Sequence, residues 1–196
     1  MQDEIKYLGH RIDANGLHPD ADKVECITNA LEPKDESTLR AFLGQINYYT
    51  HFIDNLSTIT APLNKLLKKD QPWSWSEEQS KAFKLCKQAL TSDKLLVHYD
   101  QKKPIVLDCD ASPYGVGAVI SHIYPDGSER PVAYASRSMT KAEKNYSQID
   151  REGLSIIWAV KKFKQYLLGR HFKSWFLKKG GNLFCNAQQR KQRTFT

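Results

Sequence analysis

Two segments within residues 104–168 decide how this chain folds: IVLDCDAS at Ile105–Ser112 and YSQIDREGLSIIWAVKKFKQYL at Tyr146–Leu167. In the first segment, positions 105, 107 and 109 are apolar and alternate with a second set that contains Asp108 and Asp110. This alternation has the two-residue period of a β-strand. We therefore predict a strand that carries a carboxylate, Asp110, near its end.

The second segment has the period of an amphipathic helix. One acidic residue shares the stripe on which its apolar residues recur: Ile149, Glu152, Ile156, Ala159, Phe163 and Leu167. Because a carboxylate on a buried stripe is costly to desolvate without a cation or donor beside it, Glu152 needs a partner. Asp110, 42 residues earlier, is the candidate to share a metal ion with it. Alternatively, Asp110 is solvated or caps a turn, and Glu152 lies at the edge of the stripe.

The segments around these two follow a recognisable order. After the strand come GVGAVISHIY, a turn at Pro125–Ser128, ERPVAYAS and the helix just described. With DAS at the strand end and an ERE-type helix start, this order resembles the ribonuclease H domain of gypsy-type long-terminal-repeat retrotransposon polyproteins. Upstream, YLGHRIDANGLHPDADKV and LRAFLGQINYYTHFIDNLSTITAPLNKLLKK are similar to the palm end and thumb of the same family's reverse transcriptase. The resemblance covers residues 4–173.

This resemblance implies an α+β protein. We expect a helical thumb-like segment followed by a partial RNase H-like fold, made of an antiparallel three-strand sheet and one helix. The expected parts are the end of a palm with its primer-grip hairpin at residues 1–18, a thumb- or connection-like helical region at 19–100, the partial RNase H-like domain at 101–173, and a basic divergent tail at 174–196.

The resemblance also implies a metal site. In the family, water cleaves the RNA of an RNA–DNA hybrid between two magnesium ions that acidic side chains hold. Asp110 and Glu152 match the first two of these catalytic, metal-binding carboxylates. The third is expected where this chain has Leu177, and no Asp or Glu follows Glu152. When catalytic residues act as a unit, the loss of one can cost nearly as much activity as the loss of all. We therefore expect at most weak binding of one Mg²⁺ and no useful two-metal cleavage.

The first residues read as a hairpin with a strand from Ile5 to Ile12 and a turn at Asn15-Gly16. By resemblance, Leu8, Gly9 and His10 match the primer grip, which holds the primer terminus in reverse transcriptases. By itself LGH is a weak signal, and an ordinary hairpin edge is the alternative. The polymerase aspartates of the family's palm would lie before Met1, so we do not expect this chain alone to polymerise.

Two helices are expected next, at Asp20–Leu31 and from Ser37 to about Ile53. A glycine inside a helix costs about 1 kcal/mol relative to alanine, so Gly44 requires a reason. In the family, the matching helix follows the minor groove of the primer–template duplex, with phosphate- and sugar-facing residues one turn to either side. The residues expected to contact nucleic acid there are Arg40, Gly44, Asn47 and Tyr48. Without the resemblance, close packing of another helix at Gly44 is the alternative.

The net charge of +7 is concentrated at one end of the chain. Residues 169–196 hold seven Lys or Arg and no acidic residue, which leaves 22 basic and 22 acidic residues before them. An inference from basic charge to nucleic-acid binding therefore depends on this tail. With no apolar span, no signal-peptide pattern and no CxxC spacing among four cysteines, we expect an intracellular protein, cytoplasmic or nuclear, without membrane contact.

Three functions remain open at this point. The leading hypothesis is a fragment of a retrotransposon reverse transcriptase/ribonuclease H that is catalytically incomplete in this chain. Its expected partners are an RNA–DNA hybrid or a primer–template duplex, and the rest of a Pol polyprotein. One alternative is a non-catalytic nucleic-acid-binding remnant that uses the thumb face and the basic tail. The other is a nuclease that a second chain completes.

Overall fold

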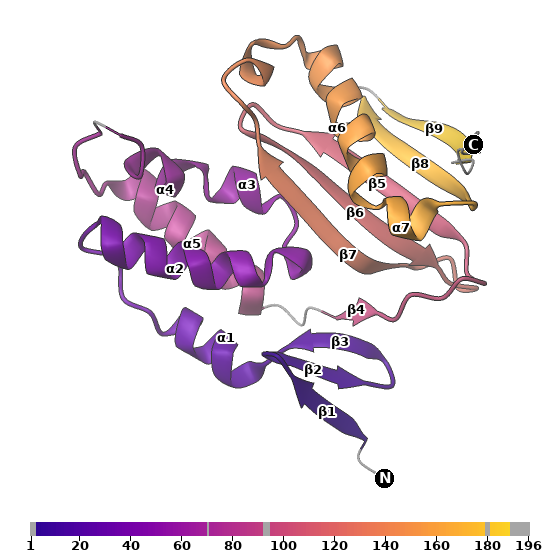
Figure 1. The fold of residues 1–196 in the computed structure, drawn as a ribbon, viewed down its shortest axis with the longest axis horizontal. Helices are drawn as coiled ribbons and strands as arrows, with labels where there is room; N and C mark the ends of the chain where they lie inside the picture. Colours follow the sequence, from indigo (N-terminus) through magenta and orange to yellow (C-terminus); the bar gives the residue numbers. More distant parts are fainter. Residues whose placement is uncertain (1–2, 70, 92–94, 179–180, 189–196) are drawn as a thin grey trace, which may run out of the picture.

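The computed structural model describes residues 3–69, 71–91, 95–178 and 181–188 (Figure 1). Its first part combines helices with a small antiparallel sheet, and its second part is a larger mixed sheet with a long helix on one face. This arrangement confirms the predicted α+β class. Across the described residues, no helix has both the length and the apolar character needed to cross a bilayer.

The small sheet has four antiparallel strands in the order β1-β2-β3-β4: Glu4–Tyr7, His10–Asp13, Gly16–Pro19 and Leu96–Val97. The prediction of one continuous strand from Ile5 to Ile12 is wrong, because the chain reverses at Leu8-Gly9. Both of these residues have positive φ, 45° and 67°, as in a two-residue hairpin turn. The second reversal lies beside Asn15-Gly16, as predicted.

Helices α1 and α2 follow the small sheet, and with η1, α3, α4 and α5 they enclose one hydrophobic core. Asp35 caps α2 by accepting a hydrogen bond from the Thr38 backbone N–H at 2.8 Å, so α2 begins before the predicted Ser37. α1 ends at Thr28, so the predicted helix end at Leu31 is wrong, and Leu31 is 85% exposed. The bounds of these elements in chain order are Ala21–Thr28, Glu36–Tyr48, Thr50–Phe52, Leu56–Ile59, Ala61–Leu66 and Glu77–Thr91.

The larger sheet contains more strands than predicted. β5, β6 and β7 are antiparallel as expected, but β8 pairs with β5 in parallel and forms an antiparallel hairpin with β9. The prediction of three strands is therefore wrong, and it missed β8 and β9 because the resemblance ends at Lys173, inside β8. The five strands, in the order β7-β6-β5-β8-β9, are Glu129–Ser138, Gly115–Ile123, Ile105–Ala111, His171–Lys178 and Gly181–Gln188.

A helical crossover, which a parallel strand pair requires, leads from β7 to β8. It comprises η2, α6 and α7 at Glu143–Asn145, Gln148–Lys162 and Lys164–Leu167, and α6 lies across the face of the sheet (Figure 1). Ala159, Phe163 and Leu167 are buried there, as predicted. Ile149 is 77% exposed, so its predicted place on the inward stripe is wrong. The apolar spacing extends to the first turn of α6, but the helix packs on the sheet only further along, so spacing alone overestimated the buried stripe.

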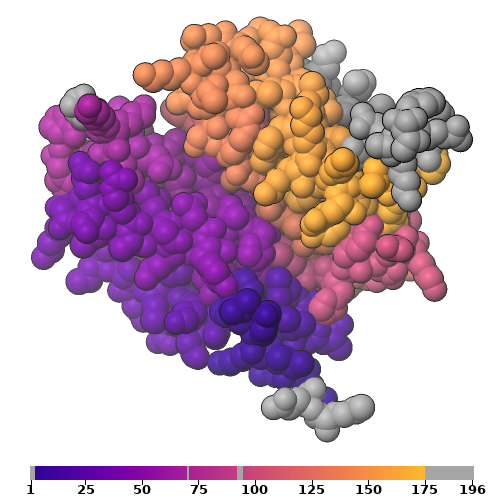
Figure 2. Space-filling model, viewed as in Figure 1, coloured from indigo at the N-terminus to yellow at the C-terminus, as the bar shows by residue number. Residues whose placement is uncertain are grey.

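The helical part docks on the opposite face of the larger sheet. Val116 and Ala118 of β6 belong to the apolar clusters beneath α6, so the glycines between and beside them present the other face. An added Cβ at Gly117 would overlap the side chain of Asn55, and one at Gly115 would meet Ser57. Because glycine has no side chain, these two positions allow the helical part to approach β6 closely. Figure 2 shows the purple helical part in direct contact with the orange part.

Hydrogen bonds hold this interface together. The Ser57 backbone N–H donates to Ser136 Oγ at 3.1 Å, and the hydroxyl groups of Thr58 and Ser112 lie 2.8 Å apart. Within the sheet, an added Cβ at Gly115 would also lie 2.6 Å from the carbonyl oxygen of Arg137 on the neighbouring strand β7, a backbone atom that cannot rotate away. The contact between the two parts therefore combines hydrogen bonds with apolar packing, since Tyr134 of β7 packs against the core of the helical part.

Candidate nucleic-acid interface and the acidic end of the sheet

Two tyrosines at the end of α2 fix the β1–β2 turn. The Tyr48 hydroxyl donates to the carbonyl oxygen of Leu8, and the Tyr49 hydroxyl donates to that of Gly9 at 2.9 Å. Burial, together with Asp20 and Tyr48, raises the pKa of Tyr49 to about 12, so its hydroxyl keeps its proton at neutral pH. The turn and the helix end therefore form one hydrogen-bonded unit.

His10 adds an aromatic contact to this unit. Its ring stacks on that of Tyr48 with centroids 5.3 Å apart and planes 9° apart. Burial lowers the pKa of His10 despite the nearby Asp20, so the imidazole is neutral at physiological pH. Its Nδ1 is buried without a hydrogen-bond partner among the residues that the structure describes. Turn, helix and imidazole together make a rigid aromatic wall.

This wall borders a pocket of about 690 Å³ between the turn, α1 and α2. Four of its lining residues belong to α2 at positions 41, 44, 45 and 48, the spacing of one helical face. A Cβ added at Gly44 would meet nothing within 4 Å, so close helix packing does not explain this glycine. The full lining is Leu8, Gly9, Lys23, Cys26, Ile27, Ala41, Gly44, Gln45, Tyr48 and Tyr49.

The structure brings together part of the predicted contact set. Leu8, Gly9, Gly44 and Tyr48 line the pocket, and His10 stacks on its wall. Two other predicted residues, Arg40 and Asn47, are exposed on α2 but do not line it, and Arg40 pairs with Glu36 at 3.4 Å. The nucleic-acid role of all seven residues stays a prediction.

Sequence reasoning missed the α1 side of the pocket and two further α2 residues. Lys23 and Cys26, one turn apart on α1, line the pocket opposite α2, and Gln45 lies beside Gly44. The spacing of Ala41 and Gln45 around Gly44 was a usable signal, since all three share one helical face. The sequence of α1 itself carries no pattern that indicates its place beside this face of α2.

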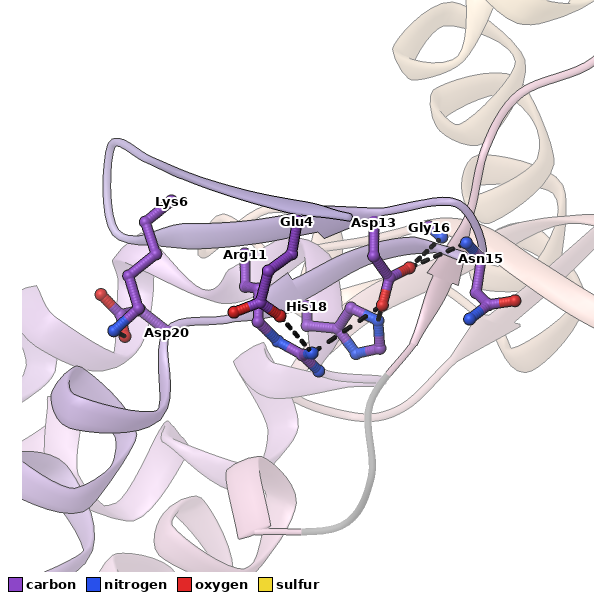
Figure 3. A network of polar contacts seen from close by, with 8 residues as sticks. All are labelled: Glu4, Lys6, Arg11, Asp13, Asn15, Gly16, His18 and Asp20. Atoms are coloured by element: carbon purple, nitrogen blue, oxygen red, sulfur yellow. Dashed lines mark hydrogen bonds and ion pairs between the residues drawn. The ribbon is translucent and has the colours of Figure 1, made fainter. Parts of the chain in front are cut away.

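A polar network stiffens the hairpin that carries the turn (Figure 3). The Asp13 carboxylate accepts from the backbone N–H groups of Asn15 at 2.8 Å and Gly16 at 3.0 Å, and it contacts His18 Nε2 at 3.0 Å. Burial alone would raise the pKa of Asp13, but these donors outweigh it and hold the pKa below its ordinary value. Arg11 pairs with Glu4 at 3.0 Å across β1 and β2.

Asp110 lies at the end of β5, on the sheet face that α6 does not cover. Its neighbours Cys109 and Ala111 both belong to apolar clusters packed by α6 residues. Because successive side chains of a strand point to opposite faces, Asp110 belongs to the face on which the helical part docks. In agreement, its cross-strand partner is Gly117, the glycine that Asn55 approaches.

Glu152 lies in the N-terminal half of α6 and is only partly buried. Its Oε1 accepts a hydrogen bond from Gln148 Nε2 at 3.1 Å. Leu154 and Trp158 of the same helix pack on Ala111 of β5, so Glu152 and Asp110 are at the same end of the sheet. The structure thus brings their elements together, while the strand pleat turns Asp110 away from α6.

The residues at this end do not fit a two-magnesium site. Magnesium takes oxygen ligands in octahedral geometry, and a two-magnesium site needs several carboxylates, of which the predicted positions supply Asp110 and Glu152 here. In β8, Phe176 pairs with Cys109, so the next residue, Leu177, takes the register position beside Asp110. Within the described parts of the chain, no group of three or more His, Cys, Asp or Glu could hold a metal ion.

A second carboxylate on the same strand face, Asp108, is unusual. Burial, with repulsion from Glu129 and Asp54, raises its pKa to about 6. Glu129 is the first residue of β7, and Asp54 comes from the loop before α3 in the helical part. Like charges therefore face each other where the two parts of the molecule meet.

Comparisons with known proteins agree with this architecture. Residues 75–174 match the family described as the RNase H-like domain found in reverse transcriptase. The Tf2-3 and Tf2-4 transposon polyproteins of Schizosaccharomyces pombe are 41% identical over 166 residues, which cover 85% of this chain. This chain spans 12% of the length of those polyproteins.

Two solved foamy viral protease–reverse transcriptase structures have a similar fold. The dRH form in complex with double-stranded DNA superposes with a TM-score of 0.72 at 24% identity, covering 87% of this chain and 30% of that chain. A complex with an RNA/DNA hybrid gives a TM-score of 0.71 at 25% identity, covering 88% of this chain and 23% of that chain. The likeness extends over both the helical part and the larger sheet.

Proposed function

This chain belongs to the family of RNase H-like domains found in reverse transcriptases, and from that premise we propose that it holds nucleic acid without cleaving it alone. It does so as a segment of a gypsy-type retroelement polyprotein. Its ligand is a primer–template duplex or an RNA–DNA hybrid. The observation that carries the proposal is the meeting of the Leu8-Gly9 turn with the Gly44–Tyr48 face of α2 at one pocket.

The chemistry of the pocket suits a nucleic-acid backbone. Tyr48, 49% exposed and braced by His10, offers a ring on which a sugar or base packs. Gly44 leaves the helix backbone open to close approach, since nothing lies above it. On the opposite wall, the exposed Lys23 supplies a cation for phosphate. The arrangement requires no base-specific contact, so we propose binding without sequence preference.

Similar proteins support this choice of ligand. The foamy viral structures with the same fold are complexes with double-stranded DNA and with an RNA/DNA hybrid. We extend that kind of ligand to this chain because its pocket combines an aromatic wall, an open helix backbone and a cation. The basic residues 169–196 add non-specific attraction to phosphate.

Cleavage by this chain alone is not part of the proposal. Family chemistry needs several carboxylates around two magnesium ions. Here Asp110 turns away from α6, Gln148 engages Glu152, and Leu177 takes the register position beside Asp110. We therefore assign Asp110 and Glu152 as remnants of a catalytic set and derive no step through magnesium.

Fluorescence anisotropy with a labelled RNA–DNA hybrid tests the binding. We expect saturable binding that weakens steeply between about 50 and about 200 mM salt, because phosphate contacts release counterions. Absence of saturable binding at the lower salt concentration would contradict the proposal.

Incubation of the same hybrid with Mg²⁺ tests the inactivity, with Asp110→Asn as the matched control. We expect no cleavage by either protein. Cleavage by the unaltered chain that Asp110→Asn abolishes would restore the hypothesis of an active nuclease.

A further inference from the structure

Arg151 differs from the other described arginines in having no partner. Its guanidinium makes no hydrogen bond or ion pair with any described residue, and its Nε is buried. The others all donate to an oxygen acceptor: Arg11 to Glu4, Arg40 to Glu36, Arg130 to Asp126, Arg137 to Glu143, and Arg170 to the Tyr99 hydroxyl. A buried donor without an acceptor is costly and calls for an explanation.

The position of Arg151 on α6 suggests one. Leu154, one turn further along the helix, packs on Ala111 and Val116 at the ends of β5 and β6. Arg151 is three residues before Leu154, so it shares that side of the helix and lies toward the strand ends. The residue is only partly buried, so its side chain also reaches the surface at this end of the sheet.

The acidic residues that adjoin Arg151 in sequence have other hydrogen-bond partners. Asp150 accepts a hydrogen bond from the Ser147 hydroxyl at 2.7 Å, and Glu152 accepts one from Gln148 at 3.1 Å. Neither carboxylate forms an ion pair with Arg151 in the described structure, although both adjoin it in sequence. Among the described residues, the Arg151 guanidinium therefore has no anionic partner and is available to an external anion.

We propose that Arg151 binds a phosphate of the nucleic-acid backbone at this end of the larger sheet. The inference rests on the proposed function and adds a second contact, on α6, to the pocket beside α2. A planar guanidinium donates two parallel hydrogen bonds to phosphate oxygens, which an ammonium cannot do. Arg151 thereby positions the strand next to Asp110 and Glu152, without taking part in any bond-breaking step.

Salt-dependent binding of the labelled hybrid tests this contact in Arg151→Gln. Loss of one phosphate contact should weaken binding about tenfold and lower the slope of log affinity against log salt by about one. Arg151→Lys keeps the charge, so its slope should stay close to that of the unaltered chain. Arg130→Gln, which removes an arginine at the opposite end of β7, is the matched control and should leave both affinity and slope unchanged.

The outcomes separate this inference from the proposed function. If the unaltered chain does not bind the hybrid, both fail. If it binds and Arg151→Gln keeps the same slope, only the role of Arg151 is overturned.

A measurement on the unaltered chain keeps the inference testable if Arg151→Gln does not fold. An arginine-specific dicarbonyl reagent is applied with and without the hybrid, and modification of Arg151 is read by mass spectrometry. Protection by the hybrid supports the contact. Full modification in the bound state, or equal protection by the same concentration of inorganic phosphate, overturns it.

Discussion

Sequence spacing predicted residues at both the pocket beside α2 and the acidic end of the larger sheet. The predicted residues come together on one face at the pocket, but not at the acidic end. At the pocket, Gly44 and Tyr48 share one helical face and line the same space as Leu8 and Gly9. Two hydrogen bonds that each span 40 residues, from Tyr48 to Leu8 and from Tyr49 to Gly9, hold the turn against the end of α2. At the acidic end, the strand pleat turns Asp110 away from the helix that carries Glu152. The spacing of residues along one helix predicts which of them share a face. The spacing between a strand residue and a helix residue does not predict whether their side chains face each other.

The largest expected effect concerns β6, where the helical part docks on the sheet face that also carries Asp110. In Gly115→Ala, the new methyl group would meet Ser57 and the Arg137 carbonyl oxygen, so the two parts of the molecule could not dock as they do. We expect a loss of about 3 kcal/mol in the free energy of unfolding, the upper range for overpacking. Urea denaturation measures it.

The matched control for this substitution is Gly153→Ala in α6. Nothing lies within 4 Å of the added Cβ at that position. Because alanine favours a helix over glycine, Gly153→Ala should gain up to about 1 kcal/mol. Equal stability of the two variants would show that the close docking at β6 does not exist.

The next effect concerns the pocket. Tyr48→Ala removes the exposed ring and its hydrogen bond to the Leu8 carbonyl oxygen. We expect hybrid affinity to fall by about 2 kcal/mol, or roughly 30-fold, as for other aromatic platforms. Anisotropy measures the loss, with Tyr124→Ala as the control because Tyr124 directly follows β6, in the larger sheet's part of the molecule and not among the residues that line the pocket. If both variants bind equally well, the pocket is not the binding site.

A smaller effect tests the charge repulsion between the two parts. Because the folded pKa of Asp108 is raised to about 6, its contribution to stability is fully present below the unfolded pKa of about 4 and is lost as pH rises through about 6. Asp108→Asn should therefore be more stable than the unaltered chain at pH 7.5 by about 1–2 kcal/mol. It should also lose the fall in melting temperature between pH 4 and 6. An unchanged pH profile would argue against the repulsion.

The smallest effect separates stability from binding at one residue. Gly44→Ala should raise the free energy of unfolding by less than about 1 kcal/mol, since alanine favours the helix and the added Cβ meets nothing. The same methyl group projects toward the ligand in the proposed complex and should weaken hybrid binding several-fold. Gly153→Ala, with the same gain in stability, should bind normally. Normal binding by Gly44→Ala would remove the reason for a glycine at this position.

Much of the fold could be predicted from sequence, because the spacing of apolar residues along a segment indicates both its secondary structure and its buried face. The α+β class, β5 to β7 and the burial of Ala159, Phe163 and Leu167 are all confirmed. The errors have physical causes. The apolar period of α6 continues to Ile149, where no sheet contact remains, and β8 and β9 lie where the resemblance ends.

The candidate site was less accessible to sequence reasoning. Periodicity placed Gly44 and Tyr48 on one face, but Lys23 on α1 joins them only through tertiary packing. For Asp110, the strand period fixed its alternation with Cys109 without saying which face α6 would cover. That choice depends on Gly115 and Gly117, which admit the helical part to one face and leave the other for α6.

Photochemical cross-linking tests the central claim most directly. An RNA–DNA hybrid with photoreactive bases is bound to the unaltered chain, irradiated and digested, and the cross-linked peptides are identified by mass spectrometry. We predict cross-links within residues 8–10 and 41–48, the two segments that border the pocket. Cross-links confined to the basic residues 169–196, with none at the pocket, would contradict the account.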